Sequence, residues 1–95
     1  MHIILLKFST HKRRAGQFMD AHKAWLKRGF DDGVFLLAGS LEPEQGGGIL
    51  AHGTSTADLQ SRVNADPFVS EQVVSAEILE LDPGRADARL QFLVS

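Results

Sequence analysis

Three segments of this chain carry large apolar side chains at consecutive positions, and this pattern limits the fold more than any other feature. The segments are residues 3–6 (IILL), 34–37 (VFLL) and, less strictly, 73–81 (VVSAEILEL). Each is short, rich in branched or aromatic residues and bounded by polar or turn-forming residues, which is typical of a strand. Neighbouring side chains of a strand point to opposite faces of a sheet. The sheet that these strands form therefore needs apolar cover on both faces.

Two helices and one more strand are predicted between these segments. Ser9 or Thr10 can cap the first helix, and Gly33 ends it in a turn formed with the two preceding aspartates. Residues 48–52 form a short third strand, and Ser55 caps a second helix that runs to about residue 64. The order is strand, helix, strand, strand, helix, strand. With right-handed crossovers it predicts an α+β ferredoxin-like fold, whose four-stranded antiparallel sheet has both helices on one face.

The second face of this sheet has no cover within the predicted fold, because two helices cover only one face. Left open, it would expose a larger apolar patch than a monomer usually does. Pairing with a second copy, sheet against sheet, is the simplest solution, and it predicts a homodimeric α/β barrel. Alternatively, the tail of residues 83–95 folds back over this face, with residues 90–94 as a further strand.

Composition excludes several classes of function. The 95 residues suffice for one domain, and a net charge of −2 gives no basic surface for nucleic acid or an anionic membrane. The absence of cysteine excludes disulfides, thiol catalysis and cysteine-bound metals. His2, His11 and His52 share no short spacing, so no metal site is expected. Residues 1–7 lack a basic leader, and their apolar run is too short for a membrane span, so a cytoplasmic location is expected.

His22 is the most informative polar residue, because it lies on the apolar stripe of the first helix. Phe18 is four positions away, and Met19 and Trp25 are three positions away, so all four side chains share one face. Neighbours in such a cleft control the charge of an imidazole, as a general base requires. Alternatively, His22 is a buried histidine bonded to a backbone carbonyl. The lysines and arginines of this helix lie mostly off the stripe and are expected in solvent.

Asp66 is the second candidate, and it precedes Pro67. Its carboxylate can cap a following helical turn, or it can orient an imidazole and stabilise the protonated form. The glycine triplet at residues 46–48 matches no phosphate-binding pattern and is expected in a hairpin loop.

Several motifs together resemble the YciI-like (YCII-related) family. Residues 21–26 (AHKAWL) are similar to its A-H-x-x-W-L helix, and residues 33–41 (GVFLLAGSL) to its G-x-F-L-x-x-G-P-L strand, with Ser40 where the family usually has proline. The remaining matches are a Gly-Gly pair at residues 47–48, a D-P-F turn at residues 66–68 and a closing strand at residues 77–81. The resemblance spans about residues 2–82 and leaves the tail, residues 83–95, outside it.

This resemblance implies a ferredoxin-like dimer with a cleft between sheet and helices. It implies that His22 and Asp66 are active-site residues, and Ser40, Trp25 and Phe68 are expected to contact the ligand. The expected function is cofactor-free acid/base chemistry on a small molecule, of the lyase or isomerase type, since a branch of the family is associated with dehydrochlorination of chlorinated aromatic intermediates. Two alternatives stay open: a non-catalytic ligand-binding or regulatory dimer, and a purely structural dimerisation module. The ligand itself is not predicted.

Overall fold

One antiparallel sheet of four strands organises the computed structural model, which describes residues 1–94. The strands lie in the order β2-β3-β1-β4, and their bounds are β1 (His2–Phe8), β2 (Phe35–Leu41), β3 (Gly46–Ala51) and β4 (Val74–Glu80). Ile4 at the centre of β1 pairs with Ile49 on one side and with Ile78 on the other. The expected α+β ferredoxin-like fold is therefore confirmed.

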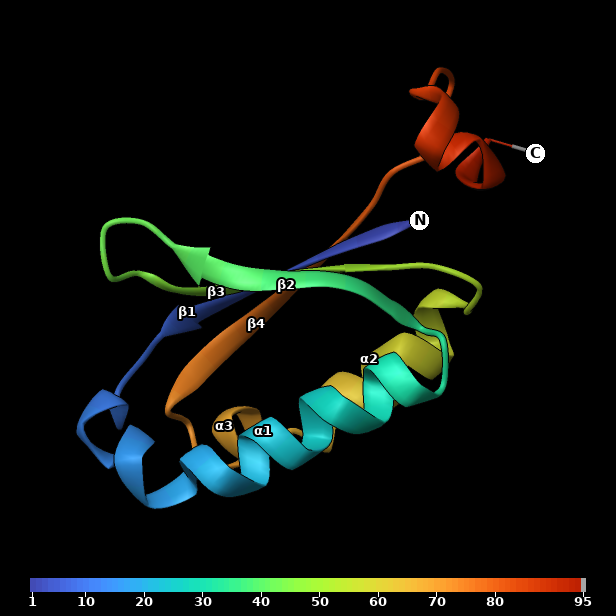
Figure 1. Ribbon diagram of the computed structural model, residues 1–95. Helices are drawn as coiled ribbons and strands as arrows, with labels where there is room; N and C mark the ends of the chain where they lie inside the picture. The colour runs from blue at the N-terminus through green and yellow to red at the C-terminus, as the bar shows by residue number, and fades with distance from the viewer. Residues whose placement is uncertain (95) are drawn as a thin grey trace.

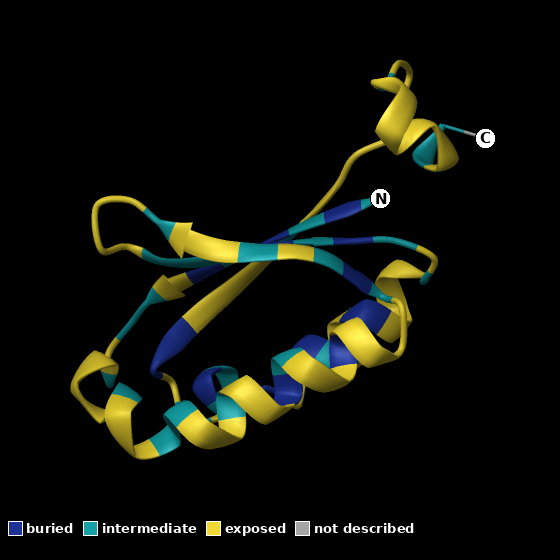
Figure 2. Ribbon diagram, in the orientation of Figure 1, coloured by how far each residue is buried: buried dark blue, intermediate teal, exposed yellow. Residues whose placement is uncertain are grey.

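All the helices of the α type lie on one face of this sheet (Figure 1). They are α1 (Ala15–Asp31), α2 (Thr56–Asn64) and the single turn α3 (Pro67–Ser70). Buried positions gather between these helices and the sheet, as Figure 2 shows. The core is made of the following buried side chains: Ile4, Leu6, Trp25, Phe35, Ile49, Ala51, Leu59, Val63, Phe68, Val73 and Val74.

The start of α1 differs from the prediction. Neither Ser9 nor Thr10 caps it, because a short 3-10 turn, η1 (Lys12–Arg14), comes first and α1 begins without a side-chain cap. The backbone N–H of Ser9 instead donates to the carbonyl of Val73, which ties this segment to the start of β4. Two other predicted boundaries are confirmed. Gly33 follows α1 with a positive φ of 74°, and the side chain of Ser55 caps α2.

The sheet face away from the helices is apolar and open. One row of aligned residues crosses all four strands on this outer face: Leu37, Leu50, Ile3 and Leu79. Leu37 is 60 % exposed and Leu79 is 42 % exposed. Because odd-numbered positions of β1 and β4 face outward, Lys7 and Glu77 place one cation and one anion on the same face.

The C-terminal tail does not form the further strand that was one of the expectations. Its described part contains a 3-10 turn, η2 (Ala88–Leu93), which lies beyond the end of the sheet (Figure 1). Asp87 begins this turn. The backbone N–H of Arg89, and to a smaller extent its side chain, donate hydrogen bonds that hold the pKa of Asp87 below its usual range. With the tail in this position, Leu37 and Leu79 remain exposed, so the tail does not cover the outer face. Residue 95 lies outside the described residues.

Within residues 1–94, no helix combines the length and the apolar character that crossing a bilayer requires.

Candidate active site

The ring of His22 contacts two aromatic side chains. His22 lies in the middle of α1, on the side that faces the sheet, where the apolar stripe had placed it. Its ring stacks on Phe68 of α3, with ring centroids 4.0 Å apart and an interplanar angle of 4°. The ring of Trp25, one turn further along α1, lies 5.7 Å away at 25°. These two contacts cover part of the imidazole ring and restrict its orientation.

Asp66 holds the same imidazole at its edge. Its Oδ1 atom lies 2.8 Å from Nδ1 of His22, and it also accepts the backbone N–H of Phe68 at 3.0 Å. Asp66 is therefore both the cap of α3 and the hydrogen-bond partner of His22. The fold brings these two side chains into contact although 44 residues separate them in the sequence.

The carboxylate of Asp66 is completely buried, while the side chain of His22 is 12 % exposed. The second carboxylate oxygen, Oδ2, is buried and accepts no hydrogen bond from the residues that the structure describes. Burial of an ionised carboxylate is costly unless donors or a positive charge compensate it. The imidazole of His22 is the ionisable side chain that contacts Asp66, and a carboxylate oxygen at this distance favours a hydrogen on Nδ1.

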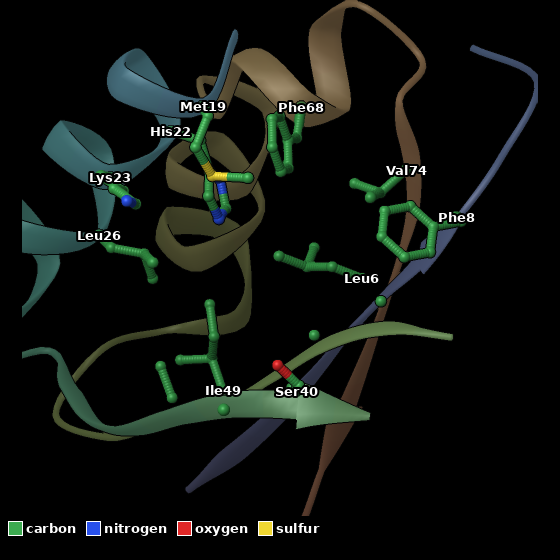
Figure 3. A pocket seen from close by; sticks show the side chains of 15 residues that line it. Leu6, Phe8, Met19, His22, Lys23, Leu26, Ser40, Ile49, Phe68 and Val74 are labelled. Atoms are coloured by element: carbon green, nitrogen blue, oxygen red, sulfur yellow. The ribbon is translucent and has the colours of Figure 1, made fainter. Parts of the chain in front are cut away.

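Hydrogen bonding at Nδ1 decides what the other ring nitrogen can do. Because Oδ1 is an acceptor in both of its contacts, Nδ1 is the donor, and Nε2 is left as the nitrogen that takes up or gives a proton. The ring lines a cavity between the helices and the sheet, as Figure 3 shows. A histidine with one nitrogen anchored on a carboxylate and the other beside a cavity has the geometry of a general acid or base.

The cavity has a volume of about 350 Å³, at the small end of ligand-binding pockets. Its helix side is formed by Met19, His22, Lys23, Leu26 and Phe68. Its sheet side is formed by Leu6, Phe8, Ala38, Gly39, Ser40, Gly46, Gly47, Gly48, Ile49 and Val74. Four of these sheet residues are glycines, so backbone rather than side chain forms much of that wall.

Two of the three expected ligand contacts line this cavity, Ser40 and Phe68. Trp25 does not. It is 2 % exposed, and its indole N–H donates to the carbonyl of Arg62 in α2 at 2.9 Å. The Trp25 ring therefore packs behind His22 and does not border the described cavity.

The structure adds lining residues that the sequence analysis did not assign to the site. Met19 and Leu26 stand three and four positions from His22, so helical spacing was the signal that could have found them. Lys23 was expected in solvent, and it is exposed, but it also lines the cavity. Gly46 and Gly47 were expected in the loop before the third strand and instead belong to β3, where they line the cavity together with Gly48.

The other three histidines lie apart from the cavity. His2 is hydrogen-bonded to Thr56, His11 to the carbonyl of Glu71, and His52 contacts the ring of Phe92. Among residues 1–94, no group of three or more side chains of the metal-binding types is close enough to hold a metal ion.

A solved structure shares this fold. It is the 5-chloro-2-hydroxyhydroquinone dehydrochlorinase from Burkholderia phenoliruptrix AC1100, in complex with 2,5-dihydroxybenzoquinone. The TM-score is 0.68 at 14 % sequence identity, and the match covers 85 % of this chain and 93 % of the dehydrochlorinase. The likeness establishes the fold. No protein-family model and no curated protein matches the sequence.

Proposed function

We propose that this protein is an enzyme that moves a proton to or from a small molecule in the cavity, with His22 as the acid or base and Asp66 as its orienting partner. The observation that carries this proposal is the 2.8 Å contact between Nδ1 of His22 and a carboxylate that is completely buried. A helix cap needs only the contact with Phe68. The added contact with a histidine beside a cavity is what a proton-transfer site requires.

The chemistry that fits is elimination or isomerisation. In an elimination, Nε2 of His22 removes a proton from the ligand, and a leaving group departs from the adjacent carbon with its bonding electrons. In an isomerisation, the same nitrogen returns the proton at a different carbon. The positive charge that the imidazole gains in either case is stabilised by the Asp66 carboxylate.

The name of the structural neighbour supports this choice of reaction class. A dehydrochlorinase removes hydrogen chloride, which is an elimination, and the neighbour is described in complex with a small quinone. At 14 % identity, that activity reaches this chain only as part of the proposal. The compound in the neighbour's name is therefore the first one to test.

The test measures chloride release from 5-chloro-2-hydroxyhydroquinone, together with exchange of ligand protons for solvent deuterium by NMR. Substitution His22→Gln should lower the rate by about 10²- to 10⁴-fold, which is the usual contribution of a general acid or base. Asp66→Asn should lower it in the same direction, because a neutral amide supports the imidazolium less well. His52→Gln is the matched control, since His52 lies away from the cavity, and it should keep the rate.

Equal rates in wild type and in His22→Gln would contradict the proposal. A ligand that binds in the cavity but is not turned over, with neither chloride release nor proton exchange, would favour the alternative of a non-catalytic binding protein.

A further inference from the structure

The ionisable side chains that line the cavity are all of one chemical kind. Among its lining residues, only His22 and Lys23 have side chains that can carry a charge, and both are basic. Asp66 is the acid nearest to His22, and it is completely buried with Oδ1 bonded to that ring. The ionisable groups that a ligand meets in the cavity are therefore basic, and Lys23 is the one that supplies a lasting positive charge.

Lys23 has no carboxylate partner within the described residues. Lys27, one helical turn further along α1, pairs with Asp31 at 2.7 Å, but no such ion pair involves Lys23. Figure 3 shows the side chain of Lys23 on the same side of the cavity as His22. An unpaired ammonium group at the rim of an apolar cavity can neutralise an anion without first breaking an ion pair.

The opposite end of the cavity carries acids. A second hollow adjoins it and shares Phe8, Ser40 and Gly46 with it, and this hollow is lined in addition by Lys12, Glu42 and Glu44. The ammonium of Lys12 lies 4.7 Å from the ring centroid of Phe8. The two glutamates of the β2–β3 hairpin outnumber Lys12 in this hollow and disfavour an anion at this end. The anionic group of a ligand is thus directed toward α1 and Lys23.

The shape of the cavity limits the rest of the ligand. Stacked aromatic rings and Met19 form one wall, and the glycine backbone of β3 forms the wall opposite. Side chains such as Leu6 and Ile49 also belong to the sheet wall, but where glycine backbone forms it a flat molecule can lie close to the sheet. With a volume of about 350 Å³, the cavity suits a ligand of about one ring.

From these features we infer that Lys23 is a specificity-determining residue, which selects small planar ligands that carry an anionic oxygen, a carboxylate or a phenolate, and places that oxygen at the α1 end of the cavity. A carbon next to this oxygen then lies on the same side as Nε2 of His22. The inference rests on the proposed use of the cavity, but it concerns binding and not turnover.

Two pairs of probes test the inference, and the two members of each pair are similar in shape but differ in charge. Benzoate and 4-nitrophenolate are the anions, and benzamide and 4-nitroanisole are their neutral counterparts. NMR titration of the backbone amides of residues 46–48 gives a dissociation constant for each probe at the cavity itself. The anions should bind the wild-type protein more tightly than the neutral probes.

Lys23→Gln should weaken anion binding by roughly two- to fivefold, as expected for an ion pair open to solvent, and leave the neutral probes unchanged. Lys27→Gln is the matched control, because Lys27 is equally a lysine of α1 but is paired with Asp31, and it should change neither class. If carboxylate and phenolate respond differently to Lys23→Gln, the larger response identifies the oxygen that the site prefers.

The inference is wrong if Lys23→Gln leaves the anion preference intact, if Lys27→Gln reduces it equally, or if no probe binds at millimolar concentration. A measurement in His22→Gln separates this outcome from failure of the proposed function. His22→Gln should lose turnover. It should still bind anions more tightly than a double variant that carries both His22→Gln and Lys23→Gln.

Discussion

At the scale of single residues, Asp66 caps α3 and accepts a hydrogen bond from His22, and it has a proposed role in proton transfer. Its Oδ1 atom accepts from the backbone of Phe68 and from His22, and the residue is completely buried. Removal of the carboxylate would leave two donors in the interior without an acceptor. Asparagine keeps an acceptor oxygen at the same place but carries no charge. A comparison of Asp66→Ala with Asp66→Asn therefore separates the effect of the hydrogen bonds from the effect of the charge.

Asp66→Ala should therefore destabilise the fold by about 1–3 kcal/mol, the cost of unsatisfied buried donors and a lost cap. Asp66→Asn should cost clearly less. Urea denaturation followed by Trp25 fluorescence measures both, since Trp25 is the one tryptophan of the sequence. Equal losses for the two variants would show that the charge, and not the acceptor atom, stabilises this turn.

His22 provides a direct test of the pairing. Because Nδ1 donates to Asp66, the neutral ring should carry its hydrogen on Nδ1, the less common tautomer of a free histidine side chain. The ¹⁵N chemical shifts of the two ring nitrogens report which one is protonated. In Asp66→Ala the population should move toward hydrogen on Nε2. A wild-type ring with hydrogen on Nε2 would contradict the pairing.

At the scale of secondary-structure elements, Trp25 connects α1 to the rest of the molecule. Its indole N–H donates to Arg62 at the end of α2, and its ring meets the edge of Phe35 on β2 at 5.1 Å. Trp25→Ala should cost about 3–5 kcal/mol, a large part of the stability of a small domain. Trp25→Phe should cost less, because it loses the hydrogen bond but keeps most of the apolar contact. Thermal denaturation followed by circular dichroism compares the two, and an unchanged midpoint for Trp25→Ala would contradict the packing described above.

Gly29 allows α1 to approach β2 closely. A Cβ atom at this position would clash with ring carbons of Phe35, whereas a Cβ atom at Gly16, near the start of the same helix, would meet no atom within 4 Å. Gly29→Ala should destabilise the fold by about 1–3 kcal/mol through overpacking. Gly16→Ala is the matched control and should be neutral or stabilising by up to ~1 kcal/mol, because alanine favours helix. Chemical denaturation of both variants gives the comparison, and an equal response would show that Phe35 yields without cost.

At the scale of the whole molecule, the open outer face leads us to propose that two copies pair sheet against sheet. The face presents an apolar row from Leu37 to Leu79, together with Lys7 and Glu77. A two-fold arrangement can bring Lys7 of one copy near Glu77 of the other. The charges of the face are then complementary between the two copies. A stable homodimer buries on the order of 2,000 Å² in total, and half of that is about one sixth of the 6107 Å² surface of one chain.

Sedimentation equilibrium at tens of micromolar should therefore give twice the chain mass of 10.4 kDa. Leu37→Lys should give the monomer mass and a folded circular dichroism spectrum, since Leu37 is already 60 % exposed in the single chain. Leu90→Lys is the control, because Leu90 is also exposed but belongs to the tail. A monomeric wild type would reject the pairing, and a monomeric Leu90→Lys with an intact Leu37→Lys dimer would move the contact from the sheet to the tail.

The sequence alone determined the features that depend on neighbours along the chain. Helical spacing placed His22 on the inner stripe, the residue types at Ser55 and Asp66 predicted caps that the structure contains, and consecutive apolar positions predicted a sheet with two apolar faces. These features follow from local hydrogen bonding and from the periods of helix and strand, which a short window of residues expresses in full. The order of the elements then left few ways to build the sheet.

Only the tertiary structure decided what these elements enclose. It showed that Oδ1 of Asp66 serves the cap and His22 together, that Trp25 packs behind the ring, and that Lys23 borders the cavity. It also placed Gly46 and Gly47 in β3 and in the cavity wall, where a loop had been expected, and it placed the tail beyond the end of the sheet. Each of these depends on strand register and on packing between segments that are distant in sequence, and no local pattern of residue types records such contacts.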